Sequence, residues 1–248
     1  MLNALFHQGV AVCEGDPDRA IYQTVATKSA AEDGGEAVLF IHTNGKDAIK
    51  SPLELLRDSG TRVCAIVDLD VLNSCATLTD IVTALTGSPP EAHILELRAR
   101  IAHIVESKNE AILLEQLKLS TKAWLDEVPP DLRRARRSLK SIAEQTGRWS
   151  LVSKGGVECF DEAARGEVLE LIGLLGQLGL FVVPSGDLES WIRLDVPKGR
   201  HWNREALRLI HQGECPLELQ DFVKEAMTFL TAEYQAPRIG IAADRGLP

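Results

Sequence analysis

Short apolar runs alternate with longer amphipathic segments in the first third of the chain. Residues 10–13, 37–42 and 62–67 are rich in aliphatic and β-branched side chains, which is typical of strands buried on both faces of a sheet. The segments between them, from 17 to about 31 and from 46 to about 58, have helical patterns and end in turns that contain glycine. This alternation predicts a mostly parallel sheet flanked by helices, the α/β class.

The pattern changes after residue 78. Residues 90–145 are rich in Ala, Leu, Glu and Lys at helical spacing and contain no strand-like run, so we expect a helical insertion. The pair Pro129-Pro130 divides it, and "DLRRARRSLKSIAEQ" is predicted to form a separate helix with Asp131 near its start.

Strand-like runs return after the insertion. "RWSLV" (148–152) and "GLFVVP" (179–184) are predicted strands, and an amphipathic helix is expected between them over 162–178. We expect helix again over 203–234 and a loose tail from 235. The domain organisation predicted from these patterns is a core made of 1–89 and 146–195, an insertion over 90–145, and a helical C-terminal region and tail over 196–248.

The charge and cysteine content exclude some classes of protein. With 27 Lys and Arg against 36 Asp and Glu, the net charge of −9 argues against a general polyanion-coating protein, although metal ions and a local basic patch would still permit a nucleic-acid enzyme. The five cysteines show no CxxC or Cys/His spacing, so structural zinc is not expected, and Cys13 and Cys64 are interpreted as small hydrophobic residues. There is no signal-peptide pattern and no apolar run of membrane-spanning length, which predicts a soluble, cytoplasmic protein.

Acidic residues follow two of the predicted strands. Glu14 comes directly after the first, and Asp68 and Asp70 follow the third. Ligand sites of parallel sheets gather beyond the carboxyl ends of the strands, and two aspartates two residues apart project to the same side if the strand conformation persists. Carboxylates without nitrogen or sulfur ligands favour Mg²⁺ or Mn²⁺. The alternative is that these are solvated loop carboxylates, and the similar position of Glu14 favours the metal site.

The stretch "DPDR" that follows Glu14 has a structural interpretation. Asp16 is expected to be an N-cap, Pro17 the first helical residue, and Asp18 a favourable charge in the first turn. Because Asp18 lies one turn beyond Glu14, it is also a candidate metal ligand.

Together these motifs resemble the TOPRIM domain, which has Glu-Gly at the end of its first strand, here Glu14-Gly15, and DxD at the end of its third, here Asp68-x-Asp70. Within that group the chain is most similar to the nucleases of the OLD (overcoming lysogenization defect) family, in which an acidic residue matching Asp18 joins the site. The resemblance also includes "VDLDVLN", the helical insertion, "WSLVSKGG" and "GLFVVPSGDLESW", and it extends roughly over residues 9–191.

The resemblance implies a metal-dependent DNA endonuclease that uses two Mg²⁺ or Mn²⁺ ions. Glu14, Asp68 and Asp70 would hold one ion or share both, and Asp18 and Glu189 would complete the second. Glu14 and Asp68 are accordingly also candidate catalytic residues.

The resemblance also implies roles for the segment "SKGG". Lys154 would face the scissile phosphate, with Ser153 as a ligand or a water-positioning group. The alternative for Lys154 is a surface lysine in a Gly-Gly turn. Glu158 and Asp187 are reserve candidates that we expect to face solvent or to cap helices.

One departure from the family concerns ATP. Complete OLD proteins carry an N-terminal ATPase, but this chain has no GxxxxGK[ST] motif, and "HTNGKDAI" is rejected as a phosphate loop because it lacks the first glycine and places Asp47 after Lys46. The expected partner is therefore an ATPase domain or subunit outside this chain, as in some two-gene phage-defence systems. The helical C-terminal region is a further candidate surface for a homodimer.

Contact with DNA requires cations. Four basic residues at i, i+3, i+4 and i+7 spacing form one stripe on a predicted helix of the insertion: Arg133, Arg136, Arg137 and Lys140. The alternative is an ordinary solvated helix face.

Two other functions remain open from the sequence. A phosphatase on a similar sheet would use Asp68 or Asp70 as a covalent nucleophile. A non-catalytic module would hold a metal structurally and dock a partner through the helical insertion.

Overall fold

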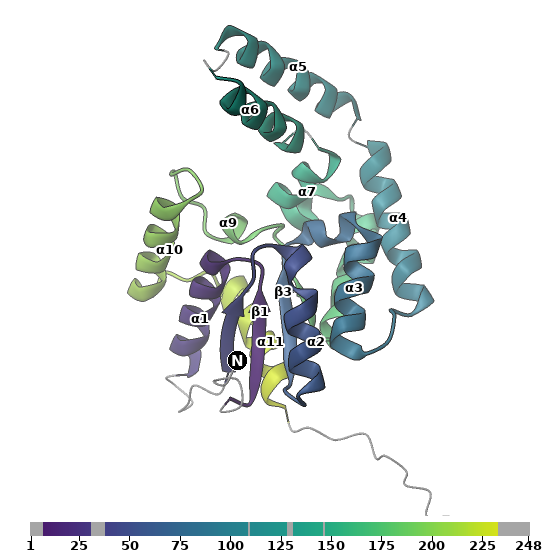
Figure 1. Cartoon of the computed structure of the whole chain (residues 1–248), viewed down its shortest axis with the longest axis vertical. Helices are drawn as coiled ribbons and strands as arrows, with labels where there is room; N and C mark the ends of the chain where they lie inside the picture. Colours follow the sequence, from purple (N-terminus) through teal and green to yellow (C-terminus); the bar gives the residue numbers. More distant parts are fainter. Residues whose placement is uncertain (1–6, 31–37, 109, 128–130, 146, 233–248) are drawn as a thin grey trace, which may run out of the picture.

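The computed structural model describes residues 7–30, 38–108, 110–127, 131–145 and 147–232. A four-stranded sheet lies at its centre, in the order β2-β1-β3-β4, and every neighbouring pair is parallel (Figure 1). The strands are β1 (Gly9–Cys13), β2 (Val38–His42), β3 (Val63–Val67) and β4 (Leu180–Val182). The α/β class with a parallel sheet, predicted from the alternation of apolar runs, is confirmed.

Both faces of the sheet are covered, which explains why the central strands are apolar at every position. Val10 and Val12 of β1 belong to one core cluster, with α2 (Lys50–Asp58), α3 (Cys75–Thr86) and α8 (Glu162–Gln177). Ala11 and Cys13 belong to the other, with α1 (Asp16–Ala30), α10 (Arg200–Gln212) and α11 (Leu217–Thr231). Successive side chains of β1 thus alternate between two buried layers.

The predicted insertion forms three helices, α4 (Ala92–Lys108), α5 (Glu110–Asp126) and α6 (Leu132–Gln145). Helix α4 packs on the body through buried Leu97 and Ile101, whereas α5 and α6 extend away from it as a pair (Figure 1). Asp131 caps α6, because its Oδ1 accepts a hydrogen bond of 2.8 Å from the N–H of Arg134. The Pro129-Pro130 pair lies outside the described residues, and the division of the chain into domains stays a prediction.

One predicted strand is wrong. Residues 148–152 belong to helix α7 (Arg148–Gly155), which is followed by the short 3₁₀ helix η4 (Gly156–Cys159). Trp149 and Val152 are three residues apart and both buried, so the apolar residues of "RWSLV" fit one face of a helix as well as a strand. A run of five residues does not distinguish these two periods.

The C-terminal region is helical, as predicted, but it consists of two helices. Helix α10 ends at Gln212 and is capped by Gly213, which has φ of 91° and lies in the left-handed region that favours glycine. Helix α11 then packs on the sheet through Phe222 and Leu230. The predicted tail, 235–248, lies outside the described residues. In the described part of the chain, no helix combines the length and the apolar character that crossing a membrane requires.

Candidate metal centre

The centre of the candidate site is the pair of strand ends that carries Glu14 and Asp68. Strands β1 and β3 are neighbours in the sheet, so the residues that follow them emerge at the same edge. The backbone N–H of Asp68 donates a hydrogen bond of 3.1 Å to Oε1 of Glu14. The structure therefore brings together these two carboxylates, which are 54 residues apart in the sequence.

Asp18 joins the site from the first turn of α1. Its Oδ2 accepts a hydrogen bond of 2.9 Å from the N–H of Gly15, and the carbonyl of Gly15 accepts one of 3.1 Å from the N–H of Arg19. Gly15 is therefore the capping residue, and Asp18 reaches back to it as the third residue of a capping box does. The expectation that Asp16 is the N-cap is wrong, because helix α1 already includes Asp16, whose side chain lies 2.7 Å from Arg19 instead.

The DxD segment has a different backbone from the one expected. Strand β3 ends at Val67, Asp68 is extended, and Leu69–Asn73 form the 3₁₀ helix η3, so the persistence of strand conformation through Asp70 is wrong. Leu69 and Val71 are fully buried and hold this turn against the core. Asp70 still lies within electrostatic range of Glu14, and its Oδ2 is 2.7 Å from Nζ of Lys46.

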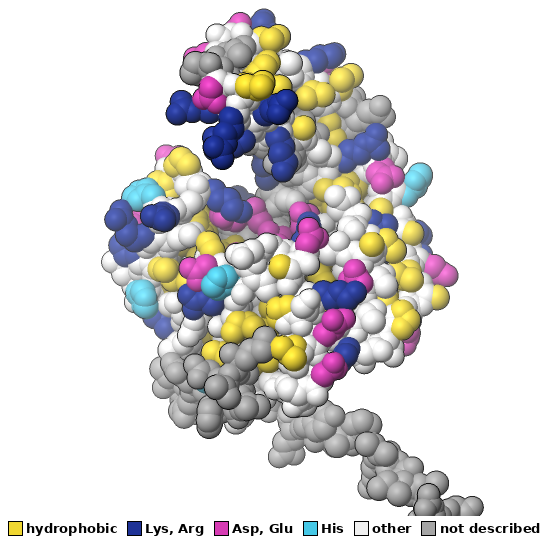
Figure 2. Space-filling view, viewed as in Figure 1, with side chains coloured by type: hydrophobic (Ala, Val, Ile, Leu, Met, Phe, Trp, Pro, Cys, Tyr) yellow, Lys and Arg dark blue, Asp and Glu magenta, His cyan; other side chains and the backbone are white. Residues whose placement is uncertain are grey.

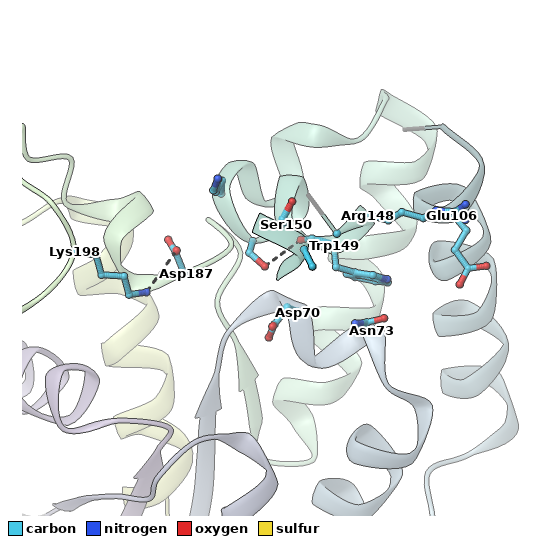
Figure 3. A pocket seen from close by; sticks show the side chains of 12 residues that line it. Asp70, Asn73, Glu106, Arg148, Trp149, Ser150, Asp187 and Lys198 are labelled. Carbon is cyan, nitrogen blue, oxygen red and sulfur yellow. Dashed lines mark hydrogen bonds and ion pairs between the residues drawn. The ribbon is translucent and has the colours of Figure 1, made fainter. Parts of the chain in front are cut away.

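Glu189 and Asp187 approach from the other side, on and before the short helix α9 (Leu188–Trp191). Asp187 caps α9 by accepting a hydrogen bond of 2.9 Å from the N–H of Ser190, in agreement with the expected capping role. Lys198 places its Nζ 2.8 Å from Oε2 of Glu189 and 4.0 Å from Oδ2 of Asp187, and Figure 3 shows Lys198 and Asp187 pointing toward each other.

Burial, together with the charges of neighbouring acids, raises the pKa values of three of these acids. Burial, then the charges of Glu14 and Asp18, raises the pKa of Asp68 to about 9. The pKa of Glu14 rises to about 7, chiefly through burial, although the N–H of Asp68 and the amine of Lys46 oppose the change. Burial and the charge of Glu189 raise the pKa of Asp18 to about 6. Three carboxyl groups that resist ionisation at one strand edge form an environment that a bound cation would relieve.

The donor set fits a hard divalent cation, since it consists of carboxylate oxygens, and the neighbouring thiol of Cys13 is fully buried in the core. In the part of the chain that the structure describes, no three acidic, His or Cys side chains are already gathered in the arrangement of a loaded metal site. Lysines instead contact two of the acids, Asp70 and Glu189. The ligand roles predicted for Glu14, Asp18, Asp68, Asp70 and Glu189 remain predictions.

Lys154 and Ser153 lie in the last turn of α7, not after a strand. Both line a cavity of about 850 Å³ with Asp70, Asp187 and Lys198. Lys154 is exposed there, and the hydroxyl of Ser153 donates to the carbonyl of Trp149 over 3.1 Å. The reserve candidate Glu158 pairs at 2.8 Å with Arg165 and is exposed, as expected for a solvent-facing residue.

A glycine fixes the position of α7 beside the strand edge. Gly186, after β4, has φ of 105°, and a Cβ there would lie 2.3 Å from the carbonyl oxygen of Ser153. The hydroxyl of Ser190 also donates to the carbonyl of Lys154 over 3.2 Å. The loop after β4 therefore packs directly on the backbone of α7 and keeps Lys154 on the side of the acids.

Two lysines near the acids were missed by the sequence analysis. Lys46 belongs to the stretch that was rejected as a phosphate loop, and Lys198 follows a proline in a segment with no recognisable motif. The signal that could have identified Lys46 was its position in the sequence, because it follows the second predicted strand as Glu14 follows the first. Although burial alone would lower the pKa of Lys198, the hydrogen bond and the charge of Glu189 raise it above its ordinary value, which favours the charged form.

The basic stripe lies on α6. Arg133, Arg136 and Arg137 are exposed and form no ion pair within the described residues, and Lys140 is also exposed. Ala143, three residues beyond Lys140, lines the same cavity as Lys154. In Figure 2 the dark blue side chains of α6 border a hollow that has acidic side chains on its floor.

Comparison with known proteins gives a partial match. A family model described as "Overcoming lysogenization defect protein-like, TOPRIM domain" matches residues 5–70. The chain is similar to a solved C-terminal region of the Xanthomonas campestris pv. campestris OLD protein, phased with iodine, with 13% identity, coverage of 91% of this chain and 95% of that one, and a TM-score of 0.39. A platinum-phased structure of that region gives 16% identity, 85% and 95% coverage, and a TM-score of 0.31.

No match was found among curated proteins. The matched residues, 5–70, include Glu14-Gly15, Asp18 and Asp68-x-Asp70, the motifs that carried the resemblance. The recognition of an OLD-like TOPRIM domain is therefore confirmed over this segment of the chain.

Proposed function

We propose that the protein is a metal-dependent endonuclease that hydrolyses phosphodiester bonds of DNA. A TOPRIM domain of the OLD family implies a metal-binding module of the nuclease or phosphoryl-transfer type. The observation that carries the proposal is the convergence of Glu14, Asp18 and Asp68 at one strand edge, where all three pKa values are raised.

Five acidic residues would hold the metal. Glu14 and Asp68 are the central pair, Asp70 lies beside them, and Asp18 and Glu189 stand on the α9 side. Two Mg²⁺ or Mn²⁺ ions bound there would supply an activated water and a stabilised leaving oxygen. Because Asp187 caps α9, we assign it the role of positioning that helix and not the role of a metal ligand.

The lysines provide the remaining positive charge. Lys154 is exposed in the cavity and forms no ion pair among the described residues, so its amine is available to a non-bridging phosphate oxygen. Lys198 lies next to Glu189 and would hold the negative charge of the substrate on the opposite wall of the cavity. Ser153 keeps acceptor capacity after donating to Trp149 and would position a water molecule.

The DNA backbone would contact the stripe on α6. From Arg133 to Lys140 the helix rises about 10 Å, a length comparable to three nucleotide steps along one strand. The stripe leads toward the cavity through Ala143. We also propose that an ATPase outside this chain controls the nuclease in a cytoplasmic phage-defence or DNA-processing system, a proposal supported by the resemblance to OLD proteins.

The test is nicking of supercoiled plasmid with Mg²⁺ or Mn²⁺. Asp68→Asn and Glu14→Gln are expected to lower the rate at least about a hundredfold, since each removes a charge on which metal binding depends. Asp58→Asn is the matched control, because Asp58 is an exposed aspartate at the end of α2, paired with Arg57. Equal activity of Asp68→Asn and Asp58→Asn would reject the assignment.

The same preparation separates the alternatives. A phosphatase would hydrolyse 4-nitrophenyl phosphate and trap phosphate on Asp68 or Asp70. A non-catalytic module would bind metal without cutting DNA, even when its ATPase partner is supplied.

A further inference from the structure

Helix α10 carries a second set of exposed cations. Its buried face consists of Trp202, Ala206 and Ile210, spaced four residues apart, and this face packs in the core cluster that includes α1 and α11. The basic residues Arg200, His201 and Arg204 are all exposed. The amphipathic pattern of α10 therefore presents positive charge to solvent at the end that begins near Lys198.

The positive charges at the start of α10 do not stabilise the helix itself. The first turn of α10 has no Asp or Glu, and the N-cap is Gly199, which offers no side-chain cap. Positive charges near a helix N-terminus oppose the helix dipole, so Arg200, the first residue of α10, stands where its charge destabilises the helix.

Among the described residues, no carboxylate forms an ion pair with Arg200 or Arg204, although Glu205 lies within electrostatic range of Arg204. Within the described residues Arg200 forms no ion pair, and the side chain of Arg204 contacts Nδ1 of His201 at 3.0 Å. Arg208, one turn further along, differs because it pairs with Glu205 at 2.7 Å and bonds to Gln212. Arg200 and Arg204 thus keep their charge available to a ligand, whereas Arg208 does not.

The position of α10 relates these cations to the candidate site. Lys198, two residues before α10 begins, lines the same cavity as Asp70 and Lys154. In Figure 2, dark blue side chains gather on α10 to the left of the hollow and on α6 above it, with acidic side chains between the two groups. The acidic pocket is thus bordered by basic surfaces from two elements distant in the sequence.

The side chains of these two borders favour a duplex over a single strand. Sites for single-stranded nucleic acid combine a basic groove with exposed aromatic rings on which bases stack. Here Trp149 is only 8% exposed and Trp202 only 2% exposed, and Trp191 packs against Tyr22 and Phe222. Among the described residues, the borders of the pocket offer cations for phosphates and no open stacking platform.

We propose that Arg200, His201 and Arg204 form a second phosphate-binding surface, which holds the backbone of duplex DNA at a border of the acidic pocket different from the one that α6 forms. This inference rests on the proposed function and extends it to the class of substrate. A duplex crossing the pocket would contact α6 with one part of its backbone and α10 with another, and the scissile phosphate would lie between them.

The test measures binding in an Asp68→Asn background, which removes cleavage. Fluorescence anisotropy measures binding to a labelled duplex of about two helical turns, about 21 base pairs, and to a labelled single strand of the same sequence. Each DNA is titrated with the protein at several salt concentrations and fixed Mg²⁺. Arg200→Ala combined with Arg204→Ala is expected to weaken duplex binding about tenfold or more and to make the slope of log K against log salt shallower by about 2, because two phosphate contacts are lost.

Matched variants make the result specific. Arg208→Ala removes a cation of the same helix that is already paired, so duplex binding is expected to stay within about twofold of the background protein. Arg200→Lys combined with Arg204→Lys is expected to retain most of the salt slope, and thermal melting of each variant checks its folding. Unchanged duplex binding in the alanine variant would overturn the proposal, as would an equal loss for the single strand.

A separate measurement distinguishes failure of this surface from failure of the proposed function. Hydrolysis of bis(4-nitrophenyl) phosphate by the unmodified protein tests the metal centre, because this diester has a single phosphate and no flanking backbone that could bind to α10. The binding experiment uses an inactive protein and therefore reports on α10 whether or not that diester is cleaved.

Discussion

The backbone N–H of Asp68 donates to the carboxylate of Glu14 over 3.1 Å, which joins the ends of β1 and β3 through one side chain. This bond holds two acidic residues close together although their charges repel. Burial raises the pKa values of both groups, and the charge of Glu14 raises that of Asp68 further.

Without metal, the protein should lose stability as the pH rises. Asp68 has an ordinary pKa of 3.8 and a folded pKa of about 9, and for Glu14 the values are 4.5 and about 7. The folded state therefore binds more protons than the unfolded state between these limits, and the free energy of unfolding falls as pH increases. Asp68→Asn should melt higher than the unmodified protein at pH 8 in EDTA, by about 2–4 °C for each kcal/mol gained.

At pH 4, below the folded pKa of both groups, the difference between Asp68→Asn and the unmodified protein should shrink. Scanning calorimetry at the two pH values checks this. If the unmodified protein were more stable than Asp68→Asn at pH 8 in EDTA, this prediction would be contradicted.

Divalent metal should stabilise the protein and release protons. Binding requires ionised carboxylates, so Mg²⁺ or Mn²⁺ should bind more tightly at pH 8 than at pH 6. At a metal concentration a hundred times Kd, the free energy of unfolding should increase by about 2.7 kcal/mol. Titration calorimetry in two buffers of different ionisation enthalpy measures the proton release, which should decrease in Glu14→Gln. Identical proton release in the two proteins would show that Glu14 does not ionise on binding.

Lys46 should compete with metal for Asp70. Its Nζ lies 2.7 Å from Oδ2 of Asp70, and a cation bound by that carboxylate would have to displace it. Because both side chains are partly exposed, Lys46→Met should tighten metal binding modestly, by about two- to fivefold. Weaker metal binding in this variant would show that Lys46 supports the metal centre and does not compete with the metal. Lys50→Met, which removes an exposed lysine paired with Asp80, serves as the control.

Arg98 should be needed to position the DxD segment. From α4, its Nε donates to the carbonyl of Leu72 over 2.8 Å and its second guanidinium nitrogen donates to that of Asn73, so Arg98 holds the end of η3. Arg98→Ala should cost about 1.5–3 kcal/mol of stability and weaken metal binding. Arg100→Ala, which removes an exposed pair with Glu167, should leave metal affinity unchanged.

Gly186→Ala should be strongly destabilising. The added Cβ would lie 2.3 Å from the carbonyl oxygen of Ser153 at a φ of 105°. Strain alone costs about 1–3 kcal/mol, and the clash adds to it by separating α7 from the loop after β4. Gly60→Ala is a matched control, because Gly60 also has positive φ but would meet nothing within 4 Å. Equal melting temperatures for the two variants would contradict this account.

The sequence predicted the fold and the location of the acidic site correctly where a single physical rule decides the outcome. The parallel sheet followed from the alternation of apolar runs and helical segments, although the order of its strands was not predicted. The positions of Glu14 and Asp68 followed from the rule that parallel strands end at one edge. Cys13 and Cys64 are fully buried and free, in agreement with their interpretation as small hydrophobic residues.

The sequence failed where tertiary contacts decide the outcome. The apolar residues of "RWSLV" suit both a strand and a helix, and the packing of Gly186 against Ser153 is part of the helical arrangement. The backbone turn at Asp70 depends on burial of Leu69 and Val71. Lys198 joins the acids only because the loop after α9 returns to the strand edge, and no local pattern encodes that return.

The acidic residues of the centre are distributed from Glu14, after the first strand, to Glu189, beyond the last one. During synthesis the ribosome releases Glu14 long before Glu189, so a nascent chain that has completed β3 still lacks β4, α9 and the lysine that follows them. A cation that needs both sides of the pocket can therefore be retained only by a finished fold. For the nuclease proposed above, this dependence would prevent cleavage until β4 and α9 have folded.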